Sequence, residues 1–310
     1  PDLKKIVDHI EKYKPAKAAV IGAGNIGLEL TEVLKKRGID IYLFEIFPEP
    51  AFFWPPLIRK ASKKKINEKG IHFFPSTAVK SVEKKGKGFI LETDKGEFTV
   101  DVVFSVVGTS PATKLCKDKI ELSENGAIMI DRAGKTSHED IYAAGDCATV
   151  YHKILDKQVY FPLGSTANKM GRITGLNMAG EKIKFPGIVG TQIFKFFELS
   201  LAKTGLSKEE AEEQGKSPRE YLALRTDKAG YYPEAVKVKV KIIADEPSGE
   251  LIGASVVSEG NAAQYIDAAA VAVFNGMKVQ DLGFFDSAYA PPYAPVWNAL
   301  VSAALKAVKT

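Results

Sequence analysis

The feature that most constrains this chain is a glycine-rich turn with the pattern GxGxxG at residues 22–27. An apolar run at Lys17–Ile21 comes directly before the turn. Residues 26–37 follow it with helical spacing and end before Gly38. A second apolar run, Ile41–Glu45, completes a segment of about thirty residues, which is the length of a βαβ unit. The sequence therefore predicts a parallel α/β sheet of the Rossmann type.

The glycines of this turn and the acid after it have the spacing of a dinucleotide-binding site. Gly22 permits the tight turn, Gly24 lets the backbone approach a pyrophosphate, and Gly27 lets the helix pack closely on the strand. Glu45 lies 18 residues beyond Gly27, where a carboxylate accepts hydrogen bonds from a ribose diol. It would repel a 2′-phosphate, and no Arg or Lys lies between Glu45 and Pro56 to compensate. We therefore expect NADH rather than NADPH.

A second candidate motif is the Gly145-Asp146 pair, which follows the short apolar run Ile141–Ala144. We expect this run to be a strand, as we do Ala127–Ile130. The Asp146 carboxylate would then lie at the C-terminal edge of a strand, where α/β sheets bind ligands. There it could accept hydrogen bonds from sugar or ribitol hydroxyls. Taken alone, however, the pattern is better explained as an ordinary turn at the end of a strand.

The rest of the chain divides into helical and extended patterns. Helical spacing is found in residues 2–13, 57–69, 164–179, 208–214, 262–274 and 296–308. Extended patterns are found in residues 71–74, 79–100, 102–107, 191–204 and 236–243. The predicted fold class is α/β, in three domains. These are a Rossmann-like NADH-binding domain (1–128), the C-terminal part of an FAD-binding domain (129–185) and an α+β dimerisation domain (186–310).

Composition excludes several classes of function. The 310 residues are 45% hydrophobic and 26% charged, a balance typical of globular proteins. Asp267, Asn298 and Lys306 interrupt the longest apolar stretches, so neither stretch provides the roughly 20 apolar residues of a membrane helix. No secretory signal pattern is visible at the N-terminus. The net charge of +5 is spread along the chain without interleaved aromatic residues, which argues against nucleic-acid binding.

Cysteine and histidine patterns argue against metal sites and nucleophilic catalysis. The four histidines are scattered without metal-binding spacing, and the two cysteines, Cys116 and Cys147, lie outside any CxxC motif. We expect both cysteines to be structural. Their small number fits a reducing compartment, so we expect the protein to be cytoplasmic.

Taken together, the ordered motifs resemble the flavoprotein pyridine nucleotide-disulfide oxidoreductase family over practically the whole chain. The motifs are GAGNIGLE at 22–29, Glu45, SVVGTSP at 105–111, TSHEDIYAAGDCA at 136–148, PLGSTANKMGRITG at 162–175, AKTGLSKEEA at 202–211 and YAPPYAPVW at 289–297. The tail motif and the absence of a CxxxxC disulfide resemble one branch of that family, which contains NADH oxidases, coenzyme A-disulfide reductases and sulfur or polysulfide reductases.

The resemblance implies two cofactors, NADH and FAD, and a homodimer. The residues implied for NADH are Gly22, Gly24, Asn25, Ile26, Gly27, Glu29, Glu45 and Gly108. Those implied for FAD are Gly145, Asp146, Leu163, Gly164, Ser165, Thr166 and Asn168. By the same resemblance Glu29 lies near the nicotinamide, although its position alone fits an exposed first-turn residue equally well. Tyr289 and Tyr293 would reach the flavin and the acceptor site of the partner subunit.

The chain also departs from this family in two ways. Family members begin with an FAD-binding segment that has its own GxGxxG and a redox-active cysteine, and this sequence has neither. We therefore expect a missing segment of about one domain, weak FAD binding by this chain alone, and unpaired strand edges with exposed apolar surface. The segment could be lost by truncation or proteolysis, or supplied by another chain. Related coenzyme A-disulfide reductases usually have a lysine in place of Trp297, which weakens the case for coenzyme A.

The favoured hypothesis is an FAD-dependent NADH oxidoreductase that passes hydride from NADH to the flavin and on to a small disulfide, sulfur or oxygen acceptor. Without the redox cysteine this chain would be inactive alone. The alternative is a non-catalytic NADH-binding and dimerisation module. A flavin-free NAD dehydrogenase is disfavoured, because no His/Asp or Tyr/Lys pair occurs at a recognisable spacing.

Overall fold

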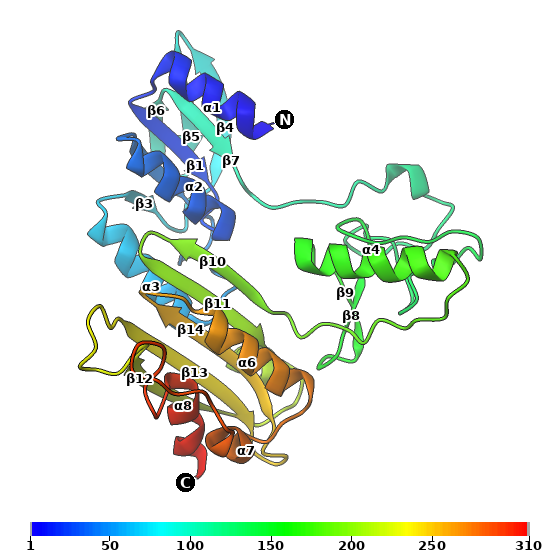
Figure 1. Cartoon of the computed structure of the whole chain (residues 1–310). Helices are drawn as coiled ribbons and strands as arrows, with labels where there is room; N and C mark the ends of the chain where they lie inside the picture. The colour runs from blue at the N-terminus through cyan, green and yellow to red at the C-terminus, as the bar shows by residue number, and fades with distance from the viewer. Residues whose placement is uncertain (1, 309–310) are drawn as a thin grey trace.

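The computed structural model describes residues 2–308, which form three parts along the chain (Figure 1). The first part contains a parallel sheet in which the strands lie in the order β3-β2-β1-β7. Its strands are β1 (Lys17–Ile21), β2 (Asp40–Phe44), β3 (His72–Phe74) and β7 (Val102–Ser105). Its helices are α1 (Asp2–Tyr13), α2 (Asn25–Lys36) and α3 (Pro56–Glu68). The predicted strand–turn–helix–strand unit is confirmed, within one residue at each helix and strand end.

Apolar side chains explain why this sheet forms. Ile41, Leu43 and Phe44 of β2 are fully buried, and Leu28 and Leu34 of α2 pack into the same core. Strands that are apolar on consecutive residues are typical of a parallel sheet covered on both faces. A three-stranded antiparallel sheet packs against this domain, as predicted for residues 79–100. It consists of β4 (Val79–Lys85), β5 (Gly88–Thr93) and β6 (Gly96–Val100).

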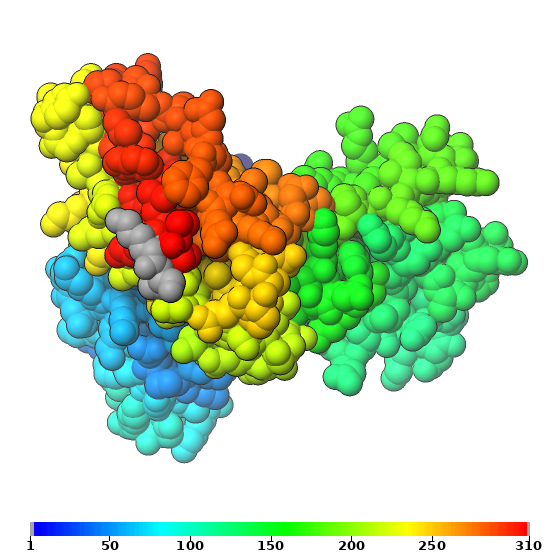
Figure 2. Space-filling model, turned by 90° about the horizontal axis from the view of Figure 1, so that it is seen from below, coloured from blue at the N-terminus to red at the C-terminus, as the bar shows by residue number. Residues whose placement is uncertain are grey.

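The second part, residues 109–188, is called the middle lobe below, and it has little regular structure. It contains a 3-10 turn (η1, Lys114–Cys116), a short hairpin of β8 (Val150–His152) and β9 (Lys157–Val159), and α4 (Gly164–Met178). A small apolar core that includes Ile128, Val150 and Met170 holds these elements together. Figures 1 and 2 show the lobe as a separate mass beside the rest of the molecule.

Two strands expected in the middle lobe are wrong. Residues 127–130 and 141–144 are not strands, because they contribute only single bridges, such as Ile128 with Ala148 and Lys135 with Tyr142. A strand requires a ladder of hydrogen bonds to a neighbour, and the described residues provide none on either side of these runs. Asp146 therefore follows an irregular segment instead of a strand.

The third part is a five-stranded antiparallel sheet in the order β10-β11-β14-β13-β12, with helices packed against it. The strands are β10 (Gln192–Phe196), β11 (Leu199–Gly205), β12 (Pro218–Thr226), β13 (Lys237–Asp245) and β14 (Leu251–Ser258). The helices are α5 (Lys208–Glu213), α6 (Ala263–Phe274), α7 (Val279–Phe284) and α8 (Ala299–Val308). Strands β12 and β14 and helix α7 were not predicted from the sequence.

Two predicted elements of this part have different boundaries. The strand expected over residues 191–204 is a hairpin, because Phe197 adopts a left-handed conformation (φ 53°) at its turn. The last helix begins at Ala299 instead of Val296. Asn298 sets this start, since its side-chain oxygen accepts hydrogen bonds of 3.0 Å from the backbone N–H groups of both Leu300 and Val301.

The hairpin tip between β10 and β11 connects the first and third parts. Phe194, Phe196 and Phe197 are buried in the same apolar core as α2 and α3 of the Rossmann-like domain. The core of the Rossmann-like domain therefore extends into the third part, whose sheet and helices also have a core of their own, and the middle lobe has a smaller separate one. Among residues 2–308, no helix combines the length and the apolar character needed to cross a membrane.

Candidate functional site

A cleft of about 800 Å³ opens beside the carboxyl ends of β1, β2 and β7. Ligands of α/β proteins bind at this edge of the sheet. The first part of the chain contributes most of the lining; β10, β11 and α5 contribute one residue each, and the middle lobe contributes two. The polar and charged residues among those that line the cleft are Asn25, Glu45, Thr77, Ser105, Thr109, Gln192, Lys203 and Glu210.

Each of the three glycines in the turn has a different reason to be glycine. Gly22 has φ +105°, and a Cβ there would lie 2.6 Å from the Val106 carbonyl oxygen. A Cβ on Gly27 would lie 2.0 Å from the carbonyl oxygen of Gly22. By contrast, a Cβ on Gly24 would meet no protein atom within 4 Å. The protein therefore requires glycine at positions 22 and 27, whereas at position 24 the open space faces the cleft and is available to a ligand.

The N-terminus of α2 opens onto this space. Gly24 is its N-cap residue, and no side chain caps the helix there. Backbone N–H groups of the first helical turn have no partner within the helix, and together with the helix dipole they favour a bound anion. The predicted residues Asn25 and Ile26 line the cleft beside Gly24.

Glu45 is held in place by the glycine turn. It is 8% exposed, and Oε2 accepts a hydrogen bond of 2.7 Å from the Ala23 N–H. Its other oxygen, Oε1, accepts one of 3.1 Å from the Phe47 N–H. A carboxylate oxygen can accept more than one hydrogen bond, so both atoms keep capacity for donors in the cleft. The carboxylate is therefore fixed at the end of β2 with its negative charge beside the glycine turn.

An aromatic loop, residues 46–54, forms one wall of the cleft. Its Ala51 N–H donates to the Ala23 carbonyl at 2.8 Å, which draws the loop back to the glycine turn. Phe47 and Phe52 stack with ring centroids 4.4 Å apart, and Trp54 contacts Phe194 of β10 at 4.7 Å. None of the sequence motifs marks this segment as part of a site. Its unusual aromatic content was the one signal that could have indicated a ligand wall.

Other predicted NADH residues are placed differently. Gly108 lines the cleft at the end of β7, whereas Gly27 lies beneath the turn and Glu29 lies outside the lining. Burial of its carboxylate is the main cause that raises the pKa of Glu29, and the nearby Glu32 charge adds to it. A hydrogen bond from the backbone of Lys195 acts in the opposite direction.

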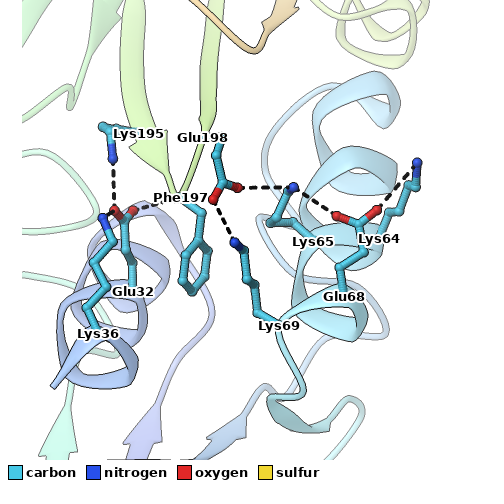
Figure 3. A network of polar contacts seen from close by, with 9 residues as sticks. All are labelled: Glu32, Lys36, Lys64, Lys65, Glu68, Lys69, Lys195, Phe197 and Glu198. Carbon is cyan, nitrogen blue, oxygen red and sulfur yellow. Dashed lines mark hydrogen bonds and ion pairs between the residues drawn. The ribbon is translucent and has the colours of Figure 1, made fainter. Parts of the chain in front are cut away.

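Two charge clusters join α2 and α3 to the β10–β11 tip (Figure 3). The buried Glu32 accepts hydrogen bonds from Lys195 at 2.8 Å, from Lys36, and from the Phe197 N–H. These bonds outweigh the burial of the carboxylate and lower the pKa of Glu32. Next to this cluster, Glu198 pairs with Lys65 of α3 and with Lys69, the residue directly after that helix. This arrangement fixes the face of α2 on which Glu29 lies.

The predicted flavin residues cluster in the middle lobe, away from the cleft. Gly145 has φ +89°, and a Cβ there would lie 3.8 Å from Ala167 Cβ, so this turn packs on the first turn of α4. Asp146 is exposed, and its carboxylate forms no hydrogen bond or ion pair with residues 2–308. The other predicted residues are the N-cap of α4 and positions in its first turns: Leu163, Gly164, Ser165, Thr166 and Asn168.

This cluster fits the polar part of a flavin on one side only. No side chain caps the N-terminus of α4, so its first N–H groups are available to an acceptor. The free carboxylate of Asp146 next to them suits ligand hydroxyls. No residue of the cluster lines the cleft between the first and third parts, where Thr109 and Phe161 are the middle-lobe residues in the lining.

The predicted acceptor-site residues lie at the far side of the third part. Tyr289 and Tyr293 are 52% and 77% exposed on the loop before α8. A hydrogen bond with the Tyr289 side chain raises the pKa of Tyr231. Neither Tyr289 nor Tyr293 lines the cleft, so within one chain the structure does not bring them together with the glycine turn.

The chain belongs to the pyridine nucleotide-disulphide oxidoreductase family. Residues 4–171 match that family, and residues 191–300 match its dimerisation domain. The resemblance inferred from the motifs is therefore confirmed, as is the α/β fold class with a Rossmann-like unit and a C-terminal dimerisation domain.

Known relatives come from the expected branch. An NAD(P)H sulfur oxidoreductase (CoA-dependent) of Pyrococcus furiosus is 34% identical over 97% of this chain and 68% of its own length. An NADH oxidase of Methanocaldococcus jannaschii is 30% identical, covering 99% of this chain and 69% of its own. The solved NAD-dependent persulfide reductase from A. fulgidus superposes with a TM-score of 0.93 at 34% identity, over 99% of this chain and 57% of that one. The chain thus spans somewhat over half to two thirds of these relatives.

Proposed function

We propose that this chain supplies the NADH-binding and dimerisation parts of an FAD-dependent NADH oxidoreductase. The observation that carries the proposal is the cleft at the glycine turn, where position 24 leaves space that no protein atom fills and Glu45 lies beside the uncapped N-terminus of α2. The relatives named above, an NAD(P)H sulfur oxidoreductase, an NADH oxidase and a persulfide reductase, all use a nicotinamide nucleotide according to their names.

Each part of the cleft has a proposed role in holding the dinucleotide. The Gly24 backbone and the first turn of α2 would hold the pyrophosphate. Glu45 would accept hydrogen bonds from the adenosine ribose and exclude a 2′-phosphate by charge repulsion. The aromatic loop and Gly108 would enclose the apolar faces. Glu29 would lie near the nicotinamide, and the contacts of Glu32 on the same helix would keep α2 in position.

We also propose that FAD is the second cofactor and that two copies of the chain associate. FAD, when bound, would supply the chemistry that accepts hydride from NADH and delivers electrons to an acceptor. Asp146 and the N-terminus of α4 would bind its polar groups. The dimer proposal is supported by the match of residues 191–300 to a dimerisation domain, and Tyr289 and Tyr293 would then face the partner subunit. The acceptor would be a small disulfide, a sulfur species or oxygen.

The location in the cell is also a proposal. Cys116 and Cys147 are both free thiols, and free thiols persist in a reducing compartment such as the cytoplasm. Labelling both with a maleimide in intact cells, before and after an oxidant, would show whether they are reduced there.

Calorimetric titration of the purified chain with NADH and NADPH tests the central proposal. We expect NADH to bind at least about tenfold more tightly than NADPH, because Glu45 repels the extra phosphate. Absence of NADH binding would overturn the proposal. An absorbance spectrum and turnover with sulfur, disulfide and oxygen acceptors would then separate an oxidoreductase from a binding module. A chain that binds NADH and dimerises but never turns over, even when combined with the FAD-binding segment of a relative, would favour the module.

A further inference from the structure

Lys203 lines the cleft and lies in the motif at residues 202–211, but that motif gives it no role. It lies on β11, in the third part of the chain, and reaches across to the aromatic loop of the first part. Its ammonium donates a hydrogen bond of 3.2 Å to the Phe53 carbonyl and lies 5.4 Å from the centroid of the Trp54 ring. It therefore connects two segments that are 150 residues apart in the sequence.

Lys203 is also the only cationic residue among those that line the cleft. Within residues 2–308, Phe53 is its one hydrogen-bond acceptor, and no carboxylate lies close enough to form an ion pair. Burial lowers the pKa of Lys203, and the charge of Glu210 opposes that effect. One oxygen of Glu210, however, is used in capping α5, since it accepts a hydrogen bond from the Ser207 N–H at 2.7 Å.

The charges of the cleft are unbalanced for the ligand proposed above. A dinucleotide brings two phosphate charges, and the protein offers the acids Glu45 and Glu210 and the single cation Lys203 in the lining. The glycine turn and the helix N-terminus contribute only partial positive charge. A partly desolvated ammonium without a counter-ion is unfavourable, and an anionic ligand supplies the missing counter-ion.

We propose that Lys203 is a phosphate-binding residue, whose ammonium pairs with the pyrophosphate of the dinucleotide held at the glycine turn. In this position it ties β11 and the aromatic loop to the ligand. The third part of the chain thus takes part in nucleotide binding as well as in association. This inference rests on the proposed function and extends it to a residue outside the Rossmann-like domain.

Calorimetric titrations with NADH, ADP-ribose and adenosine test this assignment, because only the first two contain the pyrophosphate. We expect Lys203→Met to weaken the binding of NADH and of ADP-ribose equally, by roughly tenfold to a hundredfold. A loss of this size is typical of removing a charge-assisted contact. Adenosine binding should not change. Lys203→Arg should keep most of the affinity. The matched control is Lys60→Met, which removes an exposed lysine of α3 that does not line the cleft.

Lys203→Gln provides a second neutral variant that can still donate to the Phe53 carbonyl, so loss of the loop contact is separated from loss of charge. Unchanged ADP-ribose affinity in both neutral variants would overturn the proposal. If the neutral variants lost affinity for NADH but not for ADP-ribose, Lys203 would contact the nicotinamide half instead of the pyrophosphate, and the proposal would be overturned. Equal weakening of adenosine would indicate damage to the cleft and count against a phosphate role. If the wild-type chain binds neither NADH nor ADP-ribose, the proposed function itself fails.

Discussion

The glycine turn and the Gly145-Asp146 turn have similar sequence patterns, but the structure surrounds them differently. The glycine turn follows β1, which has parallel neighbours on both sides, and its acid accepts two backbone hydrogen bonds. The segment before Asp146 has only single bridges, and its carboxylate is exposed without a partner. An apolar run before a glycine therefore becomes an ordered site only where neighbouring strands supply the rest of the ladder.

The difference also concerns where each turn obtains its stability. Glu45 lies beside a core that extends from the Rossmann-like sheet into the β10–β11 hairpin. The middle lobe depends on a smaller, separate core. We therefore expect substitutions at Gly22, Gly27 and Glu45 to change both folding and NADH binding, and substitutions at Asp146 to leave folding unchanged. The predictions below test this contrast, beginning with the largest effect.

Gly27→Ala should be the most damaging single change. Its Cβ would lie 2.0 Å from the Gly22 carbonyl oxygen, so the turn or α2 must move. We expect the free energy of unfolding to fall by about 3 kcal/mol and NADH binding to become undetectable, measured by urea denaturation and calorimetry.

Gly24→Ala is the matched control, because its Cβ meets no protein atom within 4 Å. It should leave the free energy of unfolding within about 0.5 kcal/mol of wild type and still weaken the binding of NADH. Equal destabilisation by both alanines would contradict the distinction between a glycine required by the fold and one required by the ligand.

The middle lobe should be the acid-sensitive part of the molecule. Burial lowers the pKa of His152 from 6.5 to about 4, so the unfolded chain binds this proton first. The stabilisation that the neutral His152 side chain gives to the folded state is complete above pH 6.5 and is lost as the pH falls toward 4. Between pH 6.5 and 5 we expect a loss of about 2 kcal/mol. His152→Asn keeps an acceptor for the Leu155 N–H and should flatten this dependence.

Urea denaturation at several pH values measures the effect. The window above pH 5 separates His152 from carboxylates such as Glu198, whose pKa is about 2 because it pairs with Lys69 and Lys65. The stabilisation from Glu198 is complete above its ordinary pKa of 4.5 and is lost only below it. A pH dependence that persists unchanged in His152→Asn would show that another group is responsible.

Glu45→Gln should have a moderate effect on both folding and binding. The amide keeps one acceptor, so one of the two backbone N–H groups that bond to Glu45 loses its partner. We expect the free energy of unfolding to fall by about 1–2 kcal/mol and NADH to bind roughly tenfold more weakly. Discrimination against NADPH should decrease, because the repelling charge is gone. Glu83→Gln, at an exposed position of β4, is the control, and retained NADPH discrimination in Glu45→Gln would contradict the role given to this charge.

Asp146→Ala should have the smallest effect on the fold. The side chain is exposed and has no partner among the described residues, so the free energy of unfolding should stay within about 0.5 kcal/mol of wild type. FAD fluorescence quenching should show that the wild-type chain binds FAD more weakly than NADH, and that the variant binds it more weakly still. A marked loss of stability would mean that the turn is more strongly integrated than the structure indicates.

Local patterns predicted much of the Rossmann-like domain. Helix α2 and strands β1 and β2 lie within one residue of their predicted ends, because their apolar spacing and the glycine turn are signals within the segment itself. Strand β14 was missed because all of its residues are buried, so no alternation marks it. Elements whose order depends on neighbours, such as residues 141–144, could not be judged from their own composition.

In the candidate site, too, residues within one segment could be predicted, whereas those that depend on neighbouring segments could not. Gly22, Gly24 and Glu45 were identified from spacing, since the motif lies in one continuous segment. Lys203 lies in the motif at residues 202–211, but its place in the cleft could not be inferred in this way, because it depends on contact with a loop 150 residues earlier. Residues contributed by a second part of the chain become visible only after the parts are packed together.

The β10–β11 tip has a consequence for recombining this molecule with its relatives. Phe197 is 5% exposed, donates its backbone N–H to Glu32 and lies under the Lys69 ammonium, 4.8 Å from its ring centroid. A chimera joined at the boundary between the nucleotide-binding and dimerisation domains would separate this tip from the helices that receive it. A chimera of this chain should therefore take residues 192–205, α2 and α3 from the same parent.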